Sequence, residues 1–488
     1  MIRIFGAPSP IEMSTLAKRQ IDMTEGRIFG KMIYFIIPLM LTNLLQTFYN
    51  AADMMIVSLS GEANAVGAIG TTGPVINLLV NIFIGFSTGT GVLVARQLGA
   101  KNEKGVSLTV HTSIVISLLF GTIGMVAGMI FARPMLVLMG ADSNLLDLAS
   151  TYTFVYFCGL PFISLTNYTT QIIRAKGDTR TPLIILSIAG AVNVLLNLFF
   201  VLACGMSVEG VALATAISNA LSAIALLIVL NREDGACHFD IRRICIDRDS
   251  FKNMVSIGLP AGIQSALFSL SNIIISSSLL TVNSLLTPEG TTYAPVISGT
   301  AAVSNLNGFI YTATNSVYLA SITFTSQNVG AEKYERIPRV MKSAYAITMT
   351  VGFVASTLIF VFHRPLLSLY GLYDGAEGTL EHIAYQTAYT KLIVETMTYF
   401  LLAFMEVGSG IVRGFGKSIT AMIIALCGSC LLRVVWISTV FAAYLNVASI
   451  YFSYPVSWFT TGMVNLIVAI VIYKKAMKKA RTSSGLMS

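Results

Sequence analysis

Charged residues are scarce in this sequence. Asp, Glu, Lys and Arg make up only 11% of its 488 residues, whereas a soluble domain carries about 25%. Stretches such as 63–95, 181–208, 253–288 and 290–331 contain none of these residue types. The mean hydropathy is +0.76, and 55% of the residues are hydrophobic. This composition excludes an ordinary soluble protein. Because an open sheet cannot satisfy its backbone groups in lipid, we expect an all-α integral membrane protein.

The apolar stretches are long enough for many membrane crossings, since a spanning helix needs about 20 apolar residues. They predict twelve transmembrane helices. The expected spans are 32–57, 69–95, 106–131, 149–172, 183–204, 208–230, 253–282, 296–325, 340–362, 386–412, 419–443 and 447–473.

Residues for metal or catalytic centres are also few. The six cysteines are scattered, and the one C-x-x-C pair, Cys427 and Cys430, lies inside an apolar stretch, where we interpret both as packing residues. The four histidines form no H-E-x-x-H motif, and no P-loop is present. We therefore expect neither enzymatic activity nor ATP hydrolysis, and no cofactor.

The net charge of +8 does not indicate nucleic-acid binding, because the positive residues are placed by topology. If alternate loops are assigned to opposite sides, 27 of the 31 Lys and Arg residues fall on one side together with both termini. The exceptions are Arg133, Arg364, Lys391 and Arg433. This asymmetry follows the positive-inside rule and predicts that both termini are cytoplasmic.

The two halves of the chain resemble each other. The charged stretch 231–252 divides the spans six and six, and Pro38 opens the first span as Pro260 opens the seventh. Six spans per half give both repeats the same orientation, related by a pseudo-two-fold axis along the membrane normal. We predict a cytoplasmic tail (1–27), a first lobe (28–230), a cytoplasmic linker (231–252), a second lobe (253–474) and a basic tail (475–488). Such paired halves favour alternating access.

An acidic residue, Asp53, lies at the end of the first apolar span. Asn43, Gln46, Asn50 and Asp53 have the spacing of one helix face. A carboxylate in a span costs about 2.5–3.5 kcal/mol on insertion scales and is usually functional. The alternative is a helix end whose acid reaches the lipid headgroups.

Short motifs along the twelve spans resemble those of the multidrug and toxic compound extrusion (MATE) family. They occur at 37–38 (IP), 49–53 (YNAAD), 95–100 (ARQLGA), 174–179 (RAKGDT), 209–212 (EGVA), 329–331 (VGA), 413–416 (RGFG), 432–436 (LRVVW) and 453–458 (SYPVSW). The resemblance covers about residues 28–474 and implies two six-helix lobes in a bacterial plasma membrane. It also implies efflux of amphipathic, often cationic compounds driven by inward H⁺ or Na⁺.

The resemblance also implies a cation-coupling site in the first lobe. Asp53 matches the family's acid on the first helix, where it could hold Na⁺. Asn193 matches an asparagine of the fifth helix, and Thr215 a threonine of the sixth. Asn197 stands where many members carry a second aspartate, and an amide cannot titrate.

Two further acids, Glu395 and Glu406, lie in the tenth span and complete the predicted cation-coupling set. Their eleven-residue separation puts them about 20° apart on a continuous helix. Glu395 has the alternative of pairing with Lys391 or being solvated, and Glu406 that of an ion pair with Arg433 or Arg413.

Polar residues of the spans are the candidates for substrate binding. The set comprises Asn43, Gln46, Asn50, Gln264, Asn272, Asn305 and Asn315. The expected partners are small amphipathic substrates and membrane lipid, with no nucleic acid, and the chain is expected to act as a monomer. The alternative function is a flippase of lipid-linked oligosaccharide from the same superfamily, whose anionic cargo favours more Lys and Arg within the spans.

Overall fold

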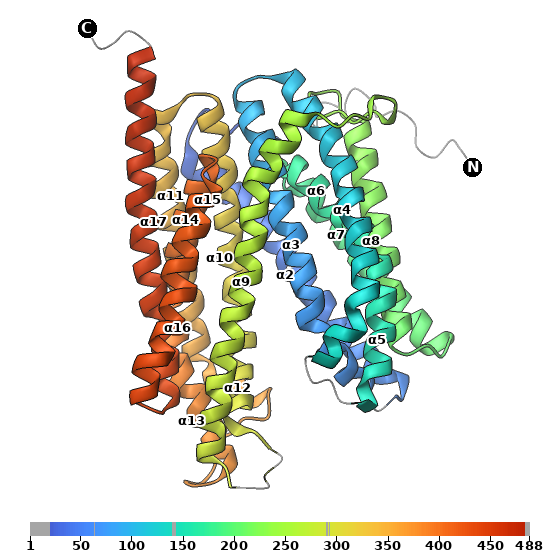
Figure 1. Cartoon of the computed structure of the whole chain (residues 1–488), viewed down its shortest axis with the longest axis vertical. Helices are drawn as coiled ribbons and strands as arrows, with labels where there is room; N and C mark the ends of the chain where they lie inside the picture. Colours follow the sequence, from blue (N-terminus) through green and yellow to red (C-terminus); the bar gives the residue numbers. More distant parts are fainter. Residues whose placement is uncertain (1–19, 63, 139–142, 289–290, 292, 484–488) are drawn as a thin grey trace. The chain divides into compact units, whose positions relative to one another are not determined.

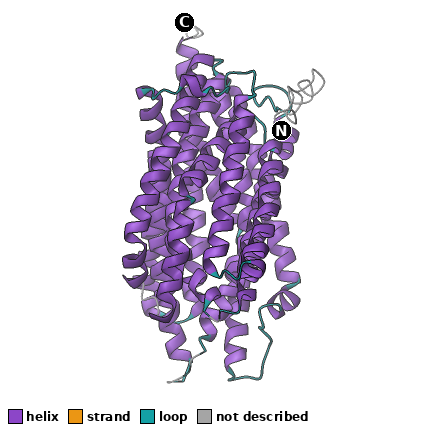
Figure 2. Cartoon of the chain, turned by 90° about the vertical axis from the view of Figure 1, so that its right-hand side faces the viewer, coloured by secondary structure: helices purple, strands orange, loops and turns teal. Residues whose placement is uncertain are grey.

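A computed structural model describes residues 20–62, 64–138, 143–288, 291 and 293–483. Most of the predicted N-terminal tail and the last five residues of the basic tail lie outside this part. The described residues form helices joined by short loops, and no strand occurs among them (Figure 2). The expected all-α fold is therefore confirmed.

Seven of the described α-helices precede the charged stretch in the middle of the chain (Figure 1). They are α2 (Ile28–Val57), α3 (Ala65–Gly99), α4 (Glu103–Leu138), α5 (Ser143–Cys158), α6 (Leu160–Ala175), α7 (Arg180–Leu198) and α8 (Val208–Asn231). A π-helical turn, Phe199–Ala203, extends α7.

Nine of the α-helices in the described part of the chain follow that stretch. They are α9 (Arg248–Leu286), α10 (Pro295–Gly330), α11 (Ile337–Val361), α12 (His363–Ser368), α13 (Leu380–Lys391), α14 (Phe400–Gly414), α15 (Ser418–Ala425), α16 (Leu432–Trp436) and α17 (Val447–Ser483). Helices α15 and α16 are joined by a π-helical segment, Leu426–Leu431, and a second one, Ile437–Phe441, continues α16.

The predicted crossings correspond to these helices. Among the described residues, nine helices are long and apolar enough to cross a membrane, and two bent pairs bring the number to as many as eleven. The bent pairs are α5 with α6, and α13 with α14. The remaining predicted span, 296–325, coincides with α10, a helix of 36 residues whose Ser, Thr and Asn content lowers its hydropathy. The chain is thus a multi-pass membrane protein.

The helices form two compact units. The first contains residues 1–72 and 93–251, and the second contains residues 73–92 and 252–488. Helix α3 therefore contributes its middle to the second unit. Close approach at glycine explains this, because a Cβ on Gly85 would collide with Gly262 of α9, and one on Gly89 with Gly258. Small residues allow such helix contact in membranes. The lobe boundaries given above stay a prediction.

The charged stretch after α8 packs onto the first unit. Cys237 and Phe239 are buried in a core shared with α4, α6 and α8. The Asp240 N–H donates to His111 Nε2 at 3.1 Å, and the Asp247 N–H donates to Thr112 Oγ1 at 2.9 Å. Burial raises the pKa of the Cys237 thiol to about 12. The segment is therefore a docked part of the first unit up to the start of α9.

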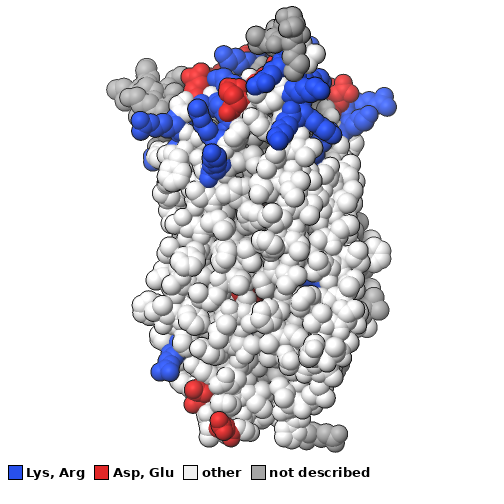
Figure 3. Space-filling model, turned by 90° about the vertical axis from the view of Figure 1, so that its left-hand side faces the viewer, with Lys and Arg blue, Asp and Glu red and all other residues white. Residues whose placement is uncertain are grey.

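Charge is segregated along the helices. On the face drawn in Figure 3, Lys and Arg side chains gather at the end where α17 finishes, next to a wide band with very few charged atoms. Large apolar side chains of α11 and α17 are exposed, such as Phe353 at 55% and Ile467 at 55%. An apolar belt of this kind suits contact with lipid rather than water.

Candidate functional site

Helices α2, α7 and α8 bring together the four residues predicted for the first lobe. Asn197 Nδ2 donates to Asp53 Oδ1 at 2.5 Å and to Asn193 Oδ1 at 3.3 Å. Asn193 Nδ2 in turn donates to Thr215 Oγ1 at 3.3 Å. Asp53, at the end of α2, thus begins a hydrogen-bond chain that crosses α7 and reaches α8.

A glycine allows α2 to approach α7 at this site. A Cβ on Gly190 would overlap the ring of Tyr49, whose hydroxyl donates to the Ser187 carbonyl oxygen at 3.0 Å. Tyr49 and Asp53 are four residues apart, and so lie on one face of α2. Gly190 and Asn197 are seven apart on α7, which is about two turns. The aromatic contact therefore fixes the register that holds Asp53 against Asn197.

The site offers oxygen atoms and no positive charge. Asp53 is half-buried, and Asn197 is fully buried with its Oδ1 lacking a hydrogen-bond partner. Among the described residues, no Lys, Arg or His lies within ion-pair distance of Asp53. No group of three His, Cys, Asp or Glu side chains suited to a metal occurs in the same part of the chain. One carboxyl with amide and hydroxyl oxygens matches a proton or a monovalent hard cation.

The remaining residues of the α2 stripe differ in their exposure. Asn43 is half-buried, whereas Gln46 and Asn50 are exposed. Within the described residues, neither the Gln46 nor the Asn50 side chain forms a hydrogen bond. Asp53, in contrast, accepts a hydrogen bond from Asn197 of α7.

In the second unit, Glu395 belongs to a different kind of cluster. Its Oε2 lies 3.5 Å from Lys391 Nζ, and its Oε1 accepts from Asn307 Nδ2 at 3.2 Å. Thr396 Oγ1 donates to Asn307 Oδ1 at 2.8 Å. The pairing with Lys391 considered from the sequence is confirmed, but the alternative of solvation is wrong, because both side chains are buried. Asn307 was not predicted from the sequence, because no sequence pattern relates a residue of α10 to one of the tenth span.

Glu406 does not form the ion pair with Arg433 or Arg413 that was the alternative interpretation of its sequence position. Among the described residues, no ion pair within 4.0 Å joins it to Arg413 or Arg433. The carboxyl interacts with Tyr311 and Asn315 of α10, and its Oε2 is buried without a hydrogen-bond partner.

Both arginines are engaged elsewhere. Arg413 donates to Tyr318 OH at 2.5 Å and to Gln264 Oε1 at 2.7 Å. Arg433 Nε donates to Ser457 Oγ at 3.0 Å, and its guanidinium lies 4.3 Å from the centre of the Tyr454 ring. Each guanidinium therefore donates these hydrogen bonds to neutral partners.

The two glutamates do not share the face of one continuous helix. A π-helical segment, Leu392–Thr396, and a break separate α13 from α14, which are bent by 42°. Tyr399, at this break, lies within electrostatic range of both Glu395 and Glu406. The 20° relation inferred from spacing is wrong, because it assumed regular α-helical geometry across the break.

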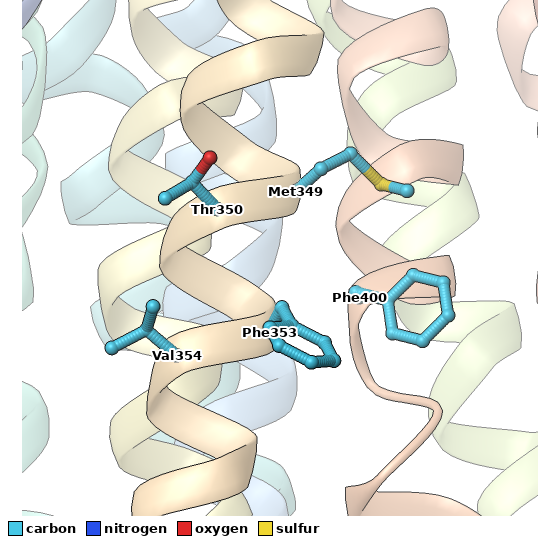
Figure 4. A pocket seen from close by; sticks show the side chains of 5 residues that line it. All are labelled: Met349, Thr350, Phe353, Val354 and Phe400. Carbon is cyan, nitrogen blue, oxygen red and sulfur yellow. The ribbon is translucent and has the colours of Figure 1, made fainter.

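The candidate substrate residues of the second unit divide into two groups. Gln264 and Asn315 join the cluster around Arg413 and Glu406. Asn272 and Asn305 are exposed, and their side chains form no hydrogen bond within the described residues. A cavity of about 350 Å³ lies elsewhere in this unit, lined by Met349, Thr350, Phe353, Val354 and Phe400 (Figure 4). It contains no charged group and none of the predicted residues.

Comparisons with known proteins agree with this architecture. The MatE family model matches residues 38–199 and 260–439. The chain is 26% identical over 412 residues to the probable multidrug resistance protein YoeA of Bacillus subtilis, covering 83% of this chain and 85% of that protein. It is 24% identical over 390 residues to an FAD transporter of Shewanella oneidensis, covering 78% and 80%.

A solved structure shows the same fold. It is an outward-facing conformation of a multidrug resistance MATE family transporter of the MOP superfamily. The TM-score is 0.83 at 19% identity, and the alignment covers 93% of this chain and 98% of that one. Twelve helices in two lobes are the shared architecture.

Proposed function

This chain belongs to the MATE family, whose members are transporters, and from that premise we propose that it is a secondary active antiporter. It exports amphipathic, cationic small molecules in exchange for inward H⁺ or Na⁺. The family match and the multidrug resistance relative support this proposal. The observation that carries it is the hydrogen-bonded set of Asp53, Asn197, Asn193 and Thr215.

Asp53 is the exchangeable site in this proposal. Its carboxyl can hold a proton or a cation, and it has no ammonium or guanidinium partner among the described residues. Asn197 supplies an oxygen but no second titratable group, so one carboxyl carries the exchange in this unit. Ion binding favours one arrangement of the transporter, and substrate binding favours the other. Exchange requires that each ligand prefer a different state.

The proposed topology puts both termini in the cytoplasm of a bacterium, with the helices in its plasma membrane. The supporting observation is the basic run at the end of α17, which comprises Lys474, Lys475, Lys478 and Lys479. Because cytoplasmic loops are rich in Lys and Arg, these residues favour that side.

The test is efflux of a cationic dye from proteoliposomes under separately imposed H⁺ and Na⁺ gradients. We expect dye movement under one gradient only, which identifies the coupling ion. Dissipating that gradient with an ionophore should stop transport. Equal dye movement with and without either gradient contradicts an antiport mechanism.

The second candidate function is transport of an anionic cargo, such as a lipid-linked oligosaccharide. Arg413 favours it, because this guanidinium is buried and its Nε has no hydrogen-bond partner within the described residues. An FAD transporter among the relatives shows that anionic cargo occurs in proteins of similar sequence. Competition for dye efflux distinguishes the two. Inhibition by a dinucleotide, but not by a second cationic dye, supports the anionic candidate.

A further inference from the structure

Lys391 occupies an unusual setting for a lysine. Its side chain is 5% exposed, at the end of α13. The Nζ donates to Ser304 Oγ at 2.5 Å and to the Thr300 carbonyl oxygen at 3.4 Å, and lies 3.5 Å from Glu395 Oε2. The Tyr451 ring centre is 5.6 Å away. A carboxylate, a hydroxyl and a carbonyl oxygen around one charge are the ligand types that bind hard cations.

Glu395 depends on this ammonium. Its Oε1 accepts from Asn307, whereas its buried Oε2 receives no hydrogen bond within the described residues and faces Lys391. Arg433 is within electrostatic range, but it donates to Ser457 and stacks on Tyr454. A buried carboxylate without a partner is strongly unfavourable. Lys391 is therefore the direct counter-charge of Glu395.

We propose that the Lys391 ammonium is a built-in substitute for an exchangeable cation at Glu395. It fills the position among Ser304, Thr300 and Glu395 that Na⁺ would otherwise occupy. The second unit then carries its cation covalently attached and takes up no ion at Glu395. Lys391 is thus a specificity-determining residue. Removing its amine converts the pocket into a Na⁺ site.

The contrast with Asp53 supports this assignment. The amides of Asn193 and Asn197 are neutral and leave the Asp53 carboxylate open to a mobile ion. Glu395, with equal charge, already has a cation within 3.5 Å. A mobile ion at Glu395 would have to displace a tethered ammonium whose effective concentration is high.

The test measures thermal unfolding of the purified full-length protein in sodium chloride and in choline chloride at equal ionic strength. All variants carry Asp53→Asn, so that any Na⁺ response belongs to the second unit. We expect no sodium-dependent shift for this background. Adding Lys391→Met should produce an upward shift in sodium of about 3 °C or more. Adding Glu395→Gln to the Lys391→Met variant should remove this sodium-dependent shift. Replacing Lys391→Met by Lys391→Arg should give no sodium-dependent shift, because the arginine keeps the positive charge.

Two results overturn the proposal. One is a sodium shift in the Asp53→Asn background that Glu395→Gln abolishes, because Na⁺ then binds with Lys391 present. The other is the absence of any sodium shift in a folded Lys391→Met variant.

A second measurement decides the matter if Lys391→Met does not fold. Glu395→Gln should then lower the unfolding temperature, because it leaves the Lys391 ammonium buried without a counter-charge. Adding Lys391→Met should recover part of the lost unfolding temperature, because it removes that ammonium. A double variant no more stable than Glu395→Gln contradicts the proposal. Neither readout involves transport, so failure here is separate from failure of the antiport function.

Discussion

Two carboxyl groups, Asp53 in the first unit and Glu395 in the second, have opposite surroundings. Asp53 is half-buried, accepts from the amide of Asn197 and has no cation at ion-pair distance within the described residues. Glu395 is buried, accepts from the amide of Asn307 and faces an ammonium. The amide contact is common to both, and the cation is not. Whether a buried acid is available to a mobile ion thus depends on whether the protein already supplies its counter-charge.

The largest expected effect comes from neutralising the open carboxyl. Asp53→Asn should abolish gradient-driven dye efflux, because an amide binds neither a proton nor a cation tightly at this site. The variant should still insert and purify like the wild type. Efflux is measured in proteoliposomes under the gradient that drives the wild type.

The matched control is Asp147→Asn, which removes the same charge from an exposed ion pair with Arg133. Its efflux should stay near the wild-type rate. Full activity of Asp53→Asn would remove the difference between the two carboxyls.

The next effect is on stability. Glu395→Gln should cost about 3–5 kcal/mol, because it leaves the Lys391 ammonium buried without its partner. Asp53→Asn should cost much less, since it strands no cation. Unfolding in detergent, followed by Trp fluorescence, compares the two variants. Similar losses for both would show that the ion pair does not distinguish these sites.

A smaller effect tests the packing that places Asp53. Gly190→Ala puts a methyl group against the Tyr49 ring and should cost about 1–3 kcal/mol while reducing efflux. Gly30→Ala on α2 is the control, because nothing lies within 4 Å of its new Cβ. It should be neutral or slightly stabilising. If the two substitutions behave alike, the α2–α7 contact does not set the position of Asp53.

The smallest effect concerns a carboxylate outside the spans, which serves as a reference. The Ser250 N–H donates to Asp247 Oδ2 at 2.8 Å and, with the Ser250 hydroxyl, lowers the pKa of Asp247. A lowered pKa gives stability that is present above the usual Asp value of about 3.9 and is lost as pH falls below it.

Asp247→Ala should therefore cost about 0.5–1 kcal/mol at pH 7, as for a lost helix N-cap, and less at pH 3. Unfolding at the two pH values measures this. A loss that is larger at pH 3 than at pH 7 would reverse the sign and exclude this cause.

The sequence by itself determined the membrane-helical fold, the approximate positions of the membrane spans and the family. These follow from the scarcity of charge and from the spacing of apolar residues, because each helix must satisfy its own backbone in lipid. The set of Asp53, Asn193, Asn197 and Thr215 was also anticipated, but through family motifs rather than spacing.

Only the tertiary structure decided which polar side chains meet. The break between α13 and α14 separates Glu395 from Glu406, although regular spacing put them on one face. Asn307 reaches Glu395 from 88 positions away, and Gln264 reaches Arg413 from 149 away. Such contacts depend on how helices pack and where they bend. Hydrophobic periodicity and composition describe one helix at a time, so they could not reveal that Asp53 meets the amide of Asn197 whereas Glu395 meets the ammonium of Lys391.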